Sequence, residues 1–418
     1  MTSDGTLSEA HRAAEQAART SYGRLIAILA ARTRDVAAAE DALADAFRTA
    51  LETWPLRGVP HRPEAWLLTA ARHRLDHGWR HEQVKAAAAF AFAAITEEAA
   101  DMIGNTAFPD ERLKLLFVCA HPAIDPAIQA PLMLQTVLGL EATHIAAAFL
   151  VSPTAMGQRL VRAKSKIRDA GIAFEVPEGD ALPERLAAVL TAIYAAYGTG
   201  WEDVLGADPK RKGLTEEAIW LARALVALSP ESPEPKGLLA LMLYCEARRP
   251  ARRTAEGAYV PLDRQDISLW SRPMIGEAER LLDEVAKFAE LGRFQLEAAI
   301  QSVHVERLVT GHENWEALLQ LYSMLLTISP TAGIRVSYAA VVAEAGDASR
   351  ALWLLDDAHD SMRDYQPYWA ARGRILHKLK RNDEARRAFE TAAALIEDEA
   401  VRAFLLSAEL ITRCSAQL

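Results

Sequence analysis

Apolar residues recur at helical spacing almost from one end of this 418-residue chain to the other. Spacings of three and four residues place them on one side of a helix. Alanine, leucine, glutamate and arginine dominate and β-branched runs are scarce, so the composition favours helix over sheet. The sequence therefore predicts an all-α chain that is long enough for two or three domains.

The charge and the cysteines narrow the class of protein. The formal net charge is −9, whereas a protein that binds duplex DNA by itself is usually basic. Cys119, Cys245 and Cys414 are far apart and form no CxxC pair, which indicates reduced thiols rather than a disulfide framework or a zinc site. The longest apolar run, residues 86–95, is too short to span a bilayer, and no signal peptide is recognisable. We expect a soluble cytoplasmic protein without a metal or a cofactor.

The last third contains a repeat of 34 residues. Three sets of residues share this spacing: Ala317, Ala351 and Ala385; Leu321, Leu355 and Phe389; Met324, Ala358 and Ala392. In the repeating pattern a small residue is followed four positions later by a large residue, and three positions after that by another small residue. This pattern resembles the tetratricopeptide repeat, in which the small residue lets two helices approach. In the last copy Trp369, Gly373 and Leu376 lie where the first helix would pack. Chance alignment in an alanine-rich and leucine-rich chain is the alternative.

The strongest local motif lies between residues 139 and 168. It predicts a short helix at about 141–149, a tight turn at 150–152, and a second helix that Ser152 caps and Pro153 begins. The apolar residues expected to face inward are Ile145, Ala146, Phe149, Met156, Leu160, Ala163 and Ile167. This order is typical of a helix-turn-helix, whose second helix enters the major groove.

The second helix is basic, with five Lys/Arg and one Asp between residues 153 and 171. The candidate contacts to bases and phosphates are Thr154, Gln158, Arg159, Arg162, Lys164 and Lys166. An ordinary helical hairpin with a solvated basic face is the alternative. The run from residue 158 to 168 resembles the fourth conserved region of extracytoplasmic-function sigma factors, which reads the minus-thirty-five promoter element.

A second resemblance lies at residues 39–54 and 63–76. The first of these stretches has one apolar stripe at helical spacing, made of Leu43, Phe47, Ala50, Leu51 and Trp54. From the residues alone, an amphipathic bundle helix would explain it. The stretches resemble the second conserved region of the same sigma family, which implies a helix that docks on the largest subunit of RNA polymerase. The candidate polymerase-binding residues are Asp41, Asp45, Phe47, Arg48 and Trp54.

The segment after this helix resembles the part of the family that opens DNA. The loop at residues 54–63 is similar to the loop that captures a flipped base of the minus-ten element. Between residues 57 and 85 there are six Lys/Arg and three Asp/Glu, and aromatic and basic side chains provide stacking and phosphate neutralisation. The candidate minus-ten residues are Arg57, His61, Trp66, Arg72, His73, Arg74 and Arg80.

A sigma factor of this family would end soon after the predicted helix-turn-helix, whereas about 240 more residues follow it in this chain. Residues 167–190, 237–243, 247–252 and 266–270 resemble a subgroup that fuses the sigma module to a helical domain ending in tetratricopeptide-like repeats. The resemblance implies region 2 at 10–85, a linker at 86–109, region 4 at 110–172, a linker at 173–183, a helical extension at 184–297 and repeats at 298–410. We expect the extension to regulate the sigma module in cis and to offer a groove for a peptide or protein.

The implied function is promoter-specific transcription initiation with core RNA polymerase, through its largest and second-largest subunits. A repeat-containing DNA-binding regulator that acts without polymerase is the alternative, and a helical scaffold without a DNA role is a third. No glycine-rich phosphate loop, nucleophile elbow or metal-ligand set suggests an enzyme. A small basic cluster at Arg248–Arg253 is expected to be a solvated loop, with nucleic-acid contact as the alternative.

Overall fold

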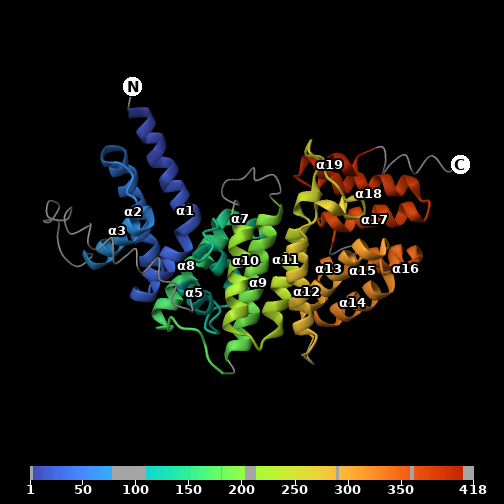
Figure 1. Cartoon of the computed structure of the whole chain (residues 1–418), viewed down its shortest axis with the longest axis horizontal. Coiled ribbons are helices and arrows are strands. Elements are labelled where there is room, and N and C mark those ends of the chain that lie inside the picture. The colour runs from blue at the N-terminus through green and yellow to red at the C-terminus, as the bar shows by residue number, and fades with distance from the viewer. Residues whose placement is uncertain are drawn as a thin grey trace. The chain divides into compact units, whose positions relative to one another are not determined.

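The computed structural model describes residues 3–77, 110–149, 151–179, 181–202, 213–288, 291–357 and 362–407 (Figure 1). In these ranges every regular element is a helix, apart from an isolated antiparallel bridge between Arg253 and Tyr259. The prediction of an all-α chain is confirmed. None of the helices in the described ranges is both long enough and apolar enough to cross a membrane. The chain divides into two compact units, residues 1–228 and 229–418.

The first unit begins with three helices that pack on one another. They are α1 (Ser3–Thr33), α2 (Val36–Arg57) and α3 (Pro63–His77). The carboxylate of Asp35 caps α2 by accepting a hydrogen bond from the amide of Ala38, at 3.1 Å. Gly58 ends α2 with a φ of 85°, a conformation that favours glycine, and its amide donates to the carbonyl of Trp54.

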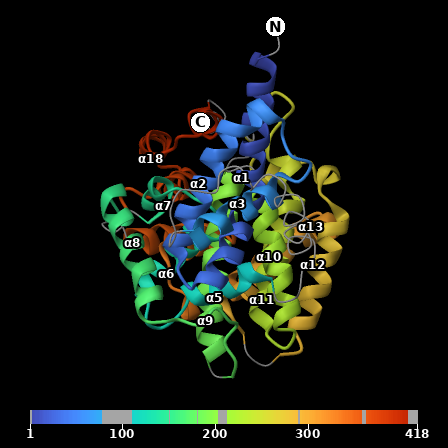
Figure 2. The same ribbon diagram turned by 90° about the vertical axis from the view of Figure 1, so that its left-hand side faces the viewer.

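The rest of the first unit contains six labelled helices. They are α5 (Glu111–Cys119), α6 (Pro126–Thr136), α7 (Ala142–Ala148), α8 (Pro153–Asp169), α9 (Ala181–Glu202) and α10 (Leu214–Leu228). Figure 2 shows α6, α7 and α8 grouped beside α1–α3. Helix α9 packs on α6 and α10 packs on α9, so the predicted linker at 173–183 joins helices of one compact unit. The limits predicted for the family domains stay predictions.

The second unit is a succession of helices that pack on their neighbours along the chain. They are α11 (Pro233–Ala247), α12 (Arg272–Val285), α13 (Arg293–Thr310), α14 (Trp315–Ile328), α15 (Ala332–Glu344), α16 (Ala348–Asp356), α17 (Gln366–Lys378), α18 (Asn382–Ala394) and α19 (Glu399–Leu405). Three short 3₁₀ helices, η1 (Arg249–Arg252), η2 (Leu262–Arg264) and η3 (Ile267–Leu269), lie between α11 and α12.

The 34-residue spacing is visible in two of the three predicted copies. Helices α16 and α18 begin 34 residues apart, and so do α15 and α17. In these copies the repeat positions are buried at Ala351, Leu355, Ala385, Phe389 and Ala392, while Ala358 lies outside the described residues.

The first predicted copy is out of register by one residue. Helix α14 begins only 33 residues before α16, so Leu318 and Leu325 are buried where Ala317 and Met324 were expected. Met324 is exposed. The sequence spacing of 34 matched residues that do not occupy the same place in their helices.

Gly373 shows why a small residue is needed in the last helical pair. A Cβ atom built on Gly373 would lie 2.8 Å from the ring of Phe389, closer than real Cβ contacts come. Because α17 and α18 approach over this glycine, the ring of Phe389 can fill the space between them.

The basic cluster at Arg248–Arg253 differs from both expectations. The Arg248 side chain is buried, donates to the Gln301 side chain of α13, and its Cζ lies 5.9 Å from the centroid of the Trp270 ring. The Arg253 guanidinium pairs with Asp398, the residue that caps α19. The segment is therefore neither a solvated loop nor an open basic surface, since its arginines join parts of the second unit.

Candidate polymerase and nucleic-acid interface

Helix α8 forms as the sequence predicts. The hydroxyl of Ser152 accepts a hydrogen bond from the amide of Ala155 at 3.3 Å, and Pro153 occupies the first helical position. Ile145 and Ala146 of α7 are buried as expected, and so are the four apolar residues of α8, which are Met156, Leu160, Ala163 and Ile167. Phe149 was expected inside and is 36% exposed, because α7 ends at Ala148, before it.

The outer face of α8 contains five of the six predicted minus-thirty-five residues. All five are exposed: Thr154, Gln158, Arg159, Arg162 and Lys166. Arg159, Arg162 and Lys166 are spaced three and four residues apart, so they lie on one side of the helix. Within the described part of the chain, none of these three forms an ion pair. Their charges are therefore available to an outside partner.

Lys164 is different, and the prediction that it faces DNA is wrong for this structure. It is 7% exposed, and its ammonium group lies 2.5 Å from the Glu40 carboxylate of α2. The reason is its position four residues after Leu160 and three before Ile167, which places it on the packed side of α8. Charge alone suggested a phosphate contact, whereas helical phase places the residue inside.

The contact between α2 and α8 has a second ion pair and a buried carboxylate. The guanidinium of Arg168 lies 3.7 Å from the carboxylate of Asp35. Burial raises the pKa of Glu40, and the charge and hydrogen bond of Lys164 offset only part of that rise. The Oε1 atom of Glu40 is buried and makes no hydrogen bond with a described residue. The ion pair of Lys164 and Glu40 therefore forms at the cost of removing two charged groups from water.

The predicted polymerase surface of α2 is partly present. Asp41 and Arg48 are exposed, and Asp45 and Phe47 are half-buried. Trp54 is only 3% exposed, so its prediction as a polymerase contact is wrong for this structure. Trp54 continues the buried side of α2 at helical spacing, and its ring packs edge-on against Trp66 with centroids 5.6 Å apart.

Two exposed leucines were missed by the sequence reasoning. Leu51 is 39% exposed, although it was placed in the apolar stripe, and Leu56 is 85% exposed near the end of α2. Leu56 directly follows Pro55 and lies off the buried stripe, which is the signal that could have identified it. Single exposed apolar side chains are common on protein surfaces, so these two leucines do not by themselves identify a binding surface.

The predicted minus-ten residues come close to the polymerase surface. Arg57, His61 and Arg74 are exposed, whereas Trp66, Arg72 and His73 are half-buried, and Arg80 lies outside the described residues. The carboxylate of Asp45 lies 2.7 Å from Arg74 of α3 and 3.2 Å from Arg48 of α2. Asp45 therefore binds one residue predicted to contact polymerase, Arg48, and one predicted to contact DNA, Arg74.

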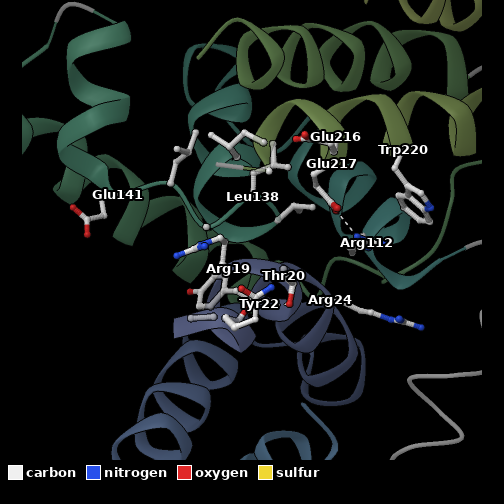
Figure 3. Close-up of a pocket in the computed structure, with 18 of the residues that line it drawn as sticks. Arg19, Thr20, Tyr22, Arg24, Arg112, Leu138, Glu141, Glu216, Glu217 and Trp220 are labelled. Carbon is white, nitrogen blue, oxygen red and sulfur yellow. Dashed lines mark hydrogen bonds and ion pairs between the residues drawn. The ribbon is translucent and has the colours of Figure 1, made fainter. Parts of the chain in front are cut away.

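An arginine that the sequence did not single out connects α5 with α10. Arg112 forms an ion pair with Asp110 at 3.0 Å. Figure 3 shows its ion pair with Glu217 and the nearby ring of Trp220, whose centroid lies 3.8 Å from the Arg112 Cζ. Burial alone would raise the pKa of Asp110, but the hydrogen bonds and charge of Arg112 outweigh it and lower that pKa. Burial raises the pKa of Glu217. No local pattern reveals this pair, because its members are 105 residues apart.

A cavity of about 1130 Å³ lies between α1, α5, the α6–α7 turn and α10 (Figure 3). Arg19 pairs with Glu15, and Arg112 pairs with Glu217, so much of the charge at its wall is matched inside the protein. Among the described residues, no cluster of three or more His, Cys, Asp or Glu could hold a metal ion.

Comparisons with known proteins add family information to this geometry. Residues 18–85 match the family described as sigma-70 region 2, and residues 185–286 match a family of unknown function, DUF6596. Over 377 residues the chain is 36% identical to an uncharacterized protein of Rhizobium meliloti (strain 1021), with 89% of each chain covered. No solved structure matches the chain.

Proposed function

We propose that this chain, which belongs to the same family as the uncharacterized Rhizobium protein and carries a sigma-70 region 2, is a sigma factor of the extracytoplasmic-function type. The region 2 match is the observation on which the proposal rests, because it supports a factor that binds RNA polymerase for transcription initiation. The chain would act in the cytoplasm, by binding and not by catalysis, and without a metal or a cofactor.

Helix α2 and the loop after it would meet polymerase and the minus-ten element. Asp41, Arg48 and the exposed Leu51 would dock on the largest subunit, with Leu56 at the edge of the contact. Beyond the end of α2, the exposed Arg57 and His61 would contact the minus-ten strand. Unstacking a base needs a flat apolar surface and neutralised phosphates, and aromatic and basic side chains provide both.

Helix α8 would read the minus-thirty-five element as the second helix of a helix-turn-helix. The proposal is supported by the cap at Ser152, by the buried inner face, and by exposed Gln158, Arg159 and Arg162 within three turns of the helix start. Arginine pairs with guanine in the major groove and glutamine with adenine, so these side chains suit base recognition. The exposed Lys166 would contact phosphate.

The part of the chain after α8 would regulate the sigma module in cis. Helices α9 and α10 pack on α6 and α5, which supports a mechanical connection between the matched family of unknown function and the proposed region 4. The second unit would end in tetratricopeptide-like repeats, supported by the 34-residue spacing of α15 and α17 and by Gly373. Such an array would offer a surface for a peptide or protein partner.

Binding to core RNA polymerase tests the proposal without knowledge of the promoter. We expect the full-length protein to bind core enzyme, and Arg48→Glu to weaken that binding about tenfold or more, because it reverses a charge within the proposed contact. Arg386→Glu is the matched control, because both arginines are exposed and lie four residues before a glutamate partner. If wild-type protein fails to bind core enzyme, the proposal is wrong.

A duplex-binding regulator that acts without polymerase remains the second candidate function, because the exposed face of α8 would suit it equally. Run-off transcription separates the two. A sigma factor starts transcripts only together with core enzyme, whereas the regulator would retard promoter DNA alone and start none.

Regulation in cis is tested by comparing the whole chain with residues 1–228, a compact unit that keeps α9 and α10 in place. We expect the two proteins to differ in transcription or in polymerase affinity. Equal values in both measurements would remove the proposal that the second unit regulates the sigma module, and leave the sigma function intact.

A further inference from the structure

A long connection, residues 248–271, separates α11 from α12. Connections between helices that pack on each other are commonly about 2–8 residues long, so this one is longer than the packing of α11 on α12 requires. Part of it folds back on itself through the bridge between Arg253 and Tyr259 and a turn at Gly257, whose φ is 87°. We name residues 253–263 the inserted segment, and Figure 1 shows it in yellow beside α19.

One end of the inserted segment contacts α19. The guanidinium of Arg253 pairs with Asp398, which caps this helix. Six residues later in the segment, the ring of Tyr259 packs edge-on against the ring of Phe404, with centroids 5.3 Å apart. The Arg253 side chain is only 9% exposed, so this end of the segment is held inside the protein.

The other end of the inserted segment crosses α13 and α17, the first helices of two pairs. The carbonyl oxygen of Leu262 accepts a hydrogen bond from the Arg307 side chain of α13 at 2.8 Å. The carboxylate of Asp263 lies 3.7 Å from Arg374 of α17. Arg374 in turn lies 2.8 Å from the carboxylate of Glu344, at the end of α15. One short segment therefore contacts α13, α17 and α19, which belong to different parts of the repeat array.

On α17 this contact uses a different side from the one that packs on α18. Gly373 approaches the Phe389 ring of α18, whereas Arg374 is the next residue and points about 100° around the helix. Lys378, one turn after Arg374, pairs with Glu344 at 2.9 Å. The first helices thus present a polar side on which the segment rests, and stacked helical repeats use such extended surfaces to bind peptides.

We infer that the inserted segment is a ligand built into the chain, and that it occupies the surface through which the second unit binds an extended peptide of a partner. The class of peptide follows from the three anchors that the surface holds. They are a cation paired with Asp398, an aromatic ring against Phe404 six residues later, and a carboxylate near Arg374 four residues after that. A partner of this kind binds by displacing the segment. The inference rests on the repeat array of the proposed function and not on its sigma activity.

The inserted segment is held incompletely, which permits exchange with a partner. The Nε and Nη1 atoms of Arg253 are buried, and no described residue offers them a hydrogen bond. A buried donor without an acceptor costs free energy that a better-fitting peptide would recover. At the other end, Asp263 and Arg374 are 54% and 51% exposed, and such exposed ion pairs contribute little to stability.

Because the inserted segment belongs to the chain, it competes at an effective concentration on the order of 1 mM. A peptide in solution with an intrinsic Kd of about 10 µM would therefore bind the wild-type protein about 100-fold more weakly than a protein whose surface is empty. Removing the segment should thus reveal a binding activity that the wild-type protein hides.

The experiment adds the segment as a separate peptide to the full-length protein. A fluorescein-labelled peptide of residues 251–265 is titrated with protein, and fluorescence anisotropy gives its Kd. Two opened variants are compared with wild type. In one, glycine and serine replace residues 253–263 at equal length, and the milder one is Tyr259→Ala/Asp263→Ala.

The controls leave the anchors of the protein intact or remove them from the peptide. The control protein is Ala255→Ser/Ala258→Ser, which changes two exposed residues of the segment that are not anchors. The control peptide has alanine at the positions of Arg253, Tyr259 and Asp263. Circular dichroism checks the helix content of every protein.

We expect both opened variants to bind the peptide at least about tenfold more tightly than wild type and the control protein do. They should bind the control peptide at least about tenfold more weakly than the original peptide. Opened variants that keep their helix content and bind the peptide no more tightly than wild type, or bind the control peptide equally well, would overturn the inference.

Hydrogen exchange in the wild-type protein gives a result that requires no variant to fold. The amide of Val260 donates to the carbonyl of Arg252 at 2.9 Å, so its exchange reports whether the segment is in place. The peptide is labelled with ¹³C, so that mass spectrometry separates its fragments from those of the protein. At about 1 mM peptide, exchange in residues 253–263 should become several-fold faster, and unchanged exchange would contradict displacement.

Core RNA polymerase binding, measured on the same proteins, separates this test from that of the proposed function. If the opened variants bind the peptide as expected and no protein binds core enzyme, the sigma function fails and the peptide surface stands. If wild type binds core enzyme and the opened variants do not bind the peptide, the peptide surface alone fails.

Discussion

Helix α8 and the segment Arg248–Arg253 are both basic in the sequence, but the structure uses their charges in opposite ways. On α8, Arg159 and Arg162 face solvent without an ion pair to any described residue. In the other segment, Arg248 is buried beside Trp270 and Arg253 pairs with Asp398. A run of arginines thus predicts neither exposure nor binding until the phase of the helix or the partners of the loop are known.

The largest effect that tests this comparison is expected on α8. Removing the guanidinium groups in Arg159→Ala/Arg162→Ala should lower promoter-specific transcription about 100-fold, since each lost base or phosphate contact costs about 1–3 kcal/mol. Stability should change by less than about 0.5 kcal/mol, because both side chains are exposed.

Run-off transcription and thermal unfolding measure the two quantities. The control is Arg350→Ala/Arg386→Ala, which removes two exposed arginines of the second unit. If promoter-specific transcription falls tenfold or less, or falls equally in the control, the exposed arginines of α8 do not recognise DNA and form only a solvated basic face.

In the segment Arg248–Arg253 we expect a substitution to lower stability and to leave DNA binding unchanged. Arg253→Ala should destabilise the second unit by about 2–3 kcal/mol, because it leaves Asp398 without its buried partner. Hydrogen exchange in α19, which Asp398 caps, should become faster, while DNA affinity stays unchanged. Loss of DNA affinity with unchanged exchange would place this segment in the same class as α8 and end the comparison.

A third arginine, Arg112, is buried in an ion pair whose contribution to stability should depend on pH. Arg112 lowers the pKa of Asp110 below its ordinary value of 3.8 despite burial, so the folded state favours the charged carboxylate. This contribution is present above the ordinary pKa and is lost as the pH falls through the folded one. Asp110→Asn should cost about 1–2 kcal/mol near neutral pH, where a hydrogen-bonded ion pair is lost.

Urea unfolding at a series of pH values measures this difference. The gap between wild type and Asp110→Asn should shrink as the pH falls below 3.8. A gap that stays constant across the series would show that the charge of Asp110 does not contribute.

The smallest effect is expected at Lys166, which is exposed on α8 and is proposed to contact phosphate. Lys166→Ala should weaken DNA binding a few-fold for all sequences alike and reduce the salt slope of log Kd by about one. Titrations at several salt concentrations with specific and unrelated DNA give both values. A loss confined to one sequence would indicate a base contact instead.

The fold was more predictable than the site. Helical periodicity, the Ser152 cap and the buried face of α8 follow from the sequence, because spacing and capping are local. Lys164 was misassigned because its charge was given more weight than its helical phase, and Trp54 because the family resemblance was given more weight than its place in the apolar stripe. The bond between Arg112 and Glu217 could not be predicted, because it joins residues 105 positions apart. The 33-residue offset between α14 and α16 was hidden by abundant alanine and leucine.

The most direct test of the central claim is start-site sequencing of transcripts made in vitro. Core RNA polymerase is supplied with a fragment library of the source genome, with and without the full-length protein. The account predicts discrete start sites that depend on the protein and share two upstream elements about 25 base pairs apart. Transcripts identical to those of core enzyme alone would contradict it.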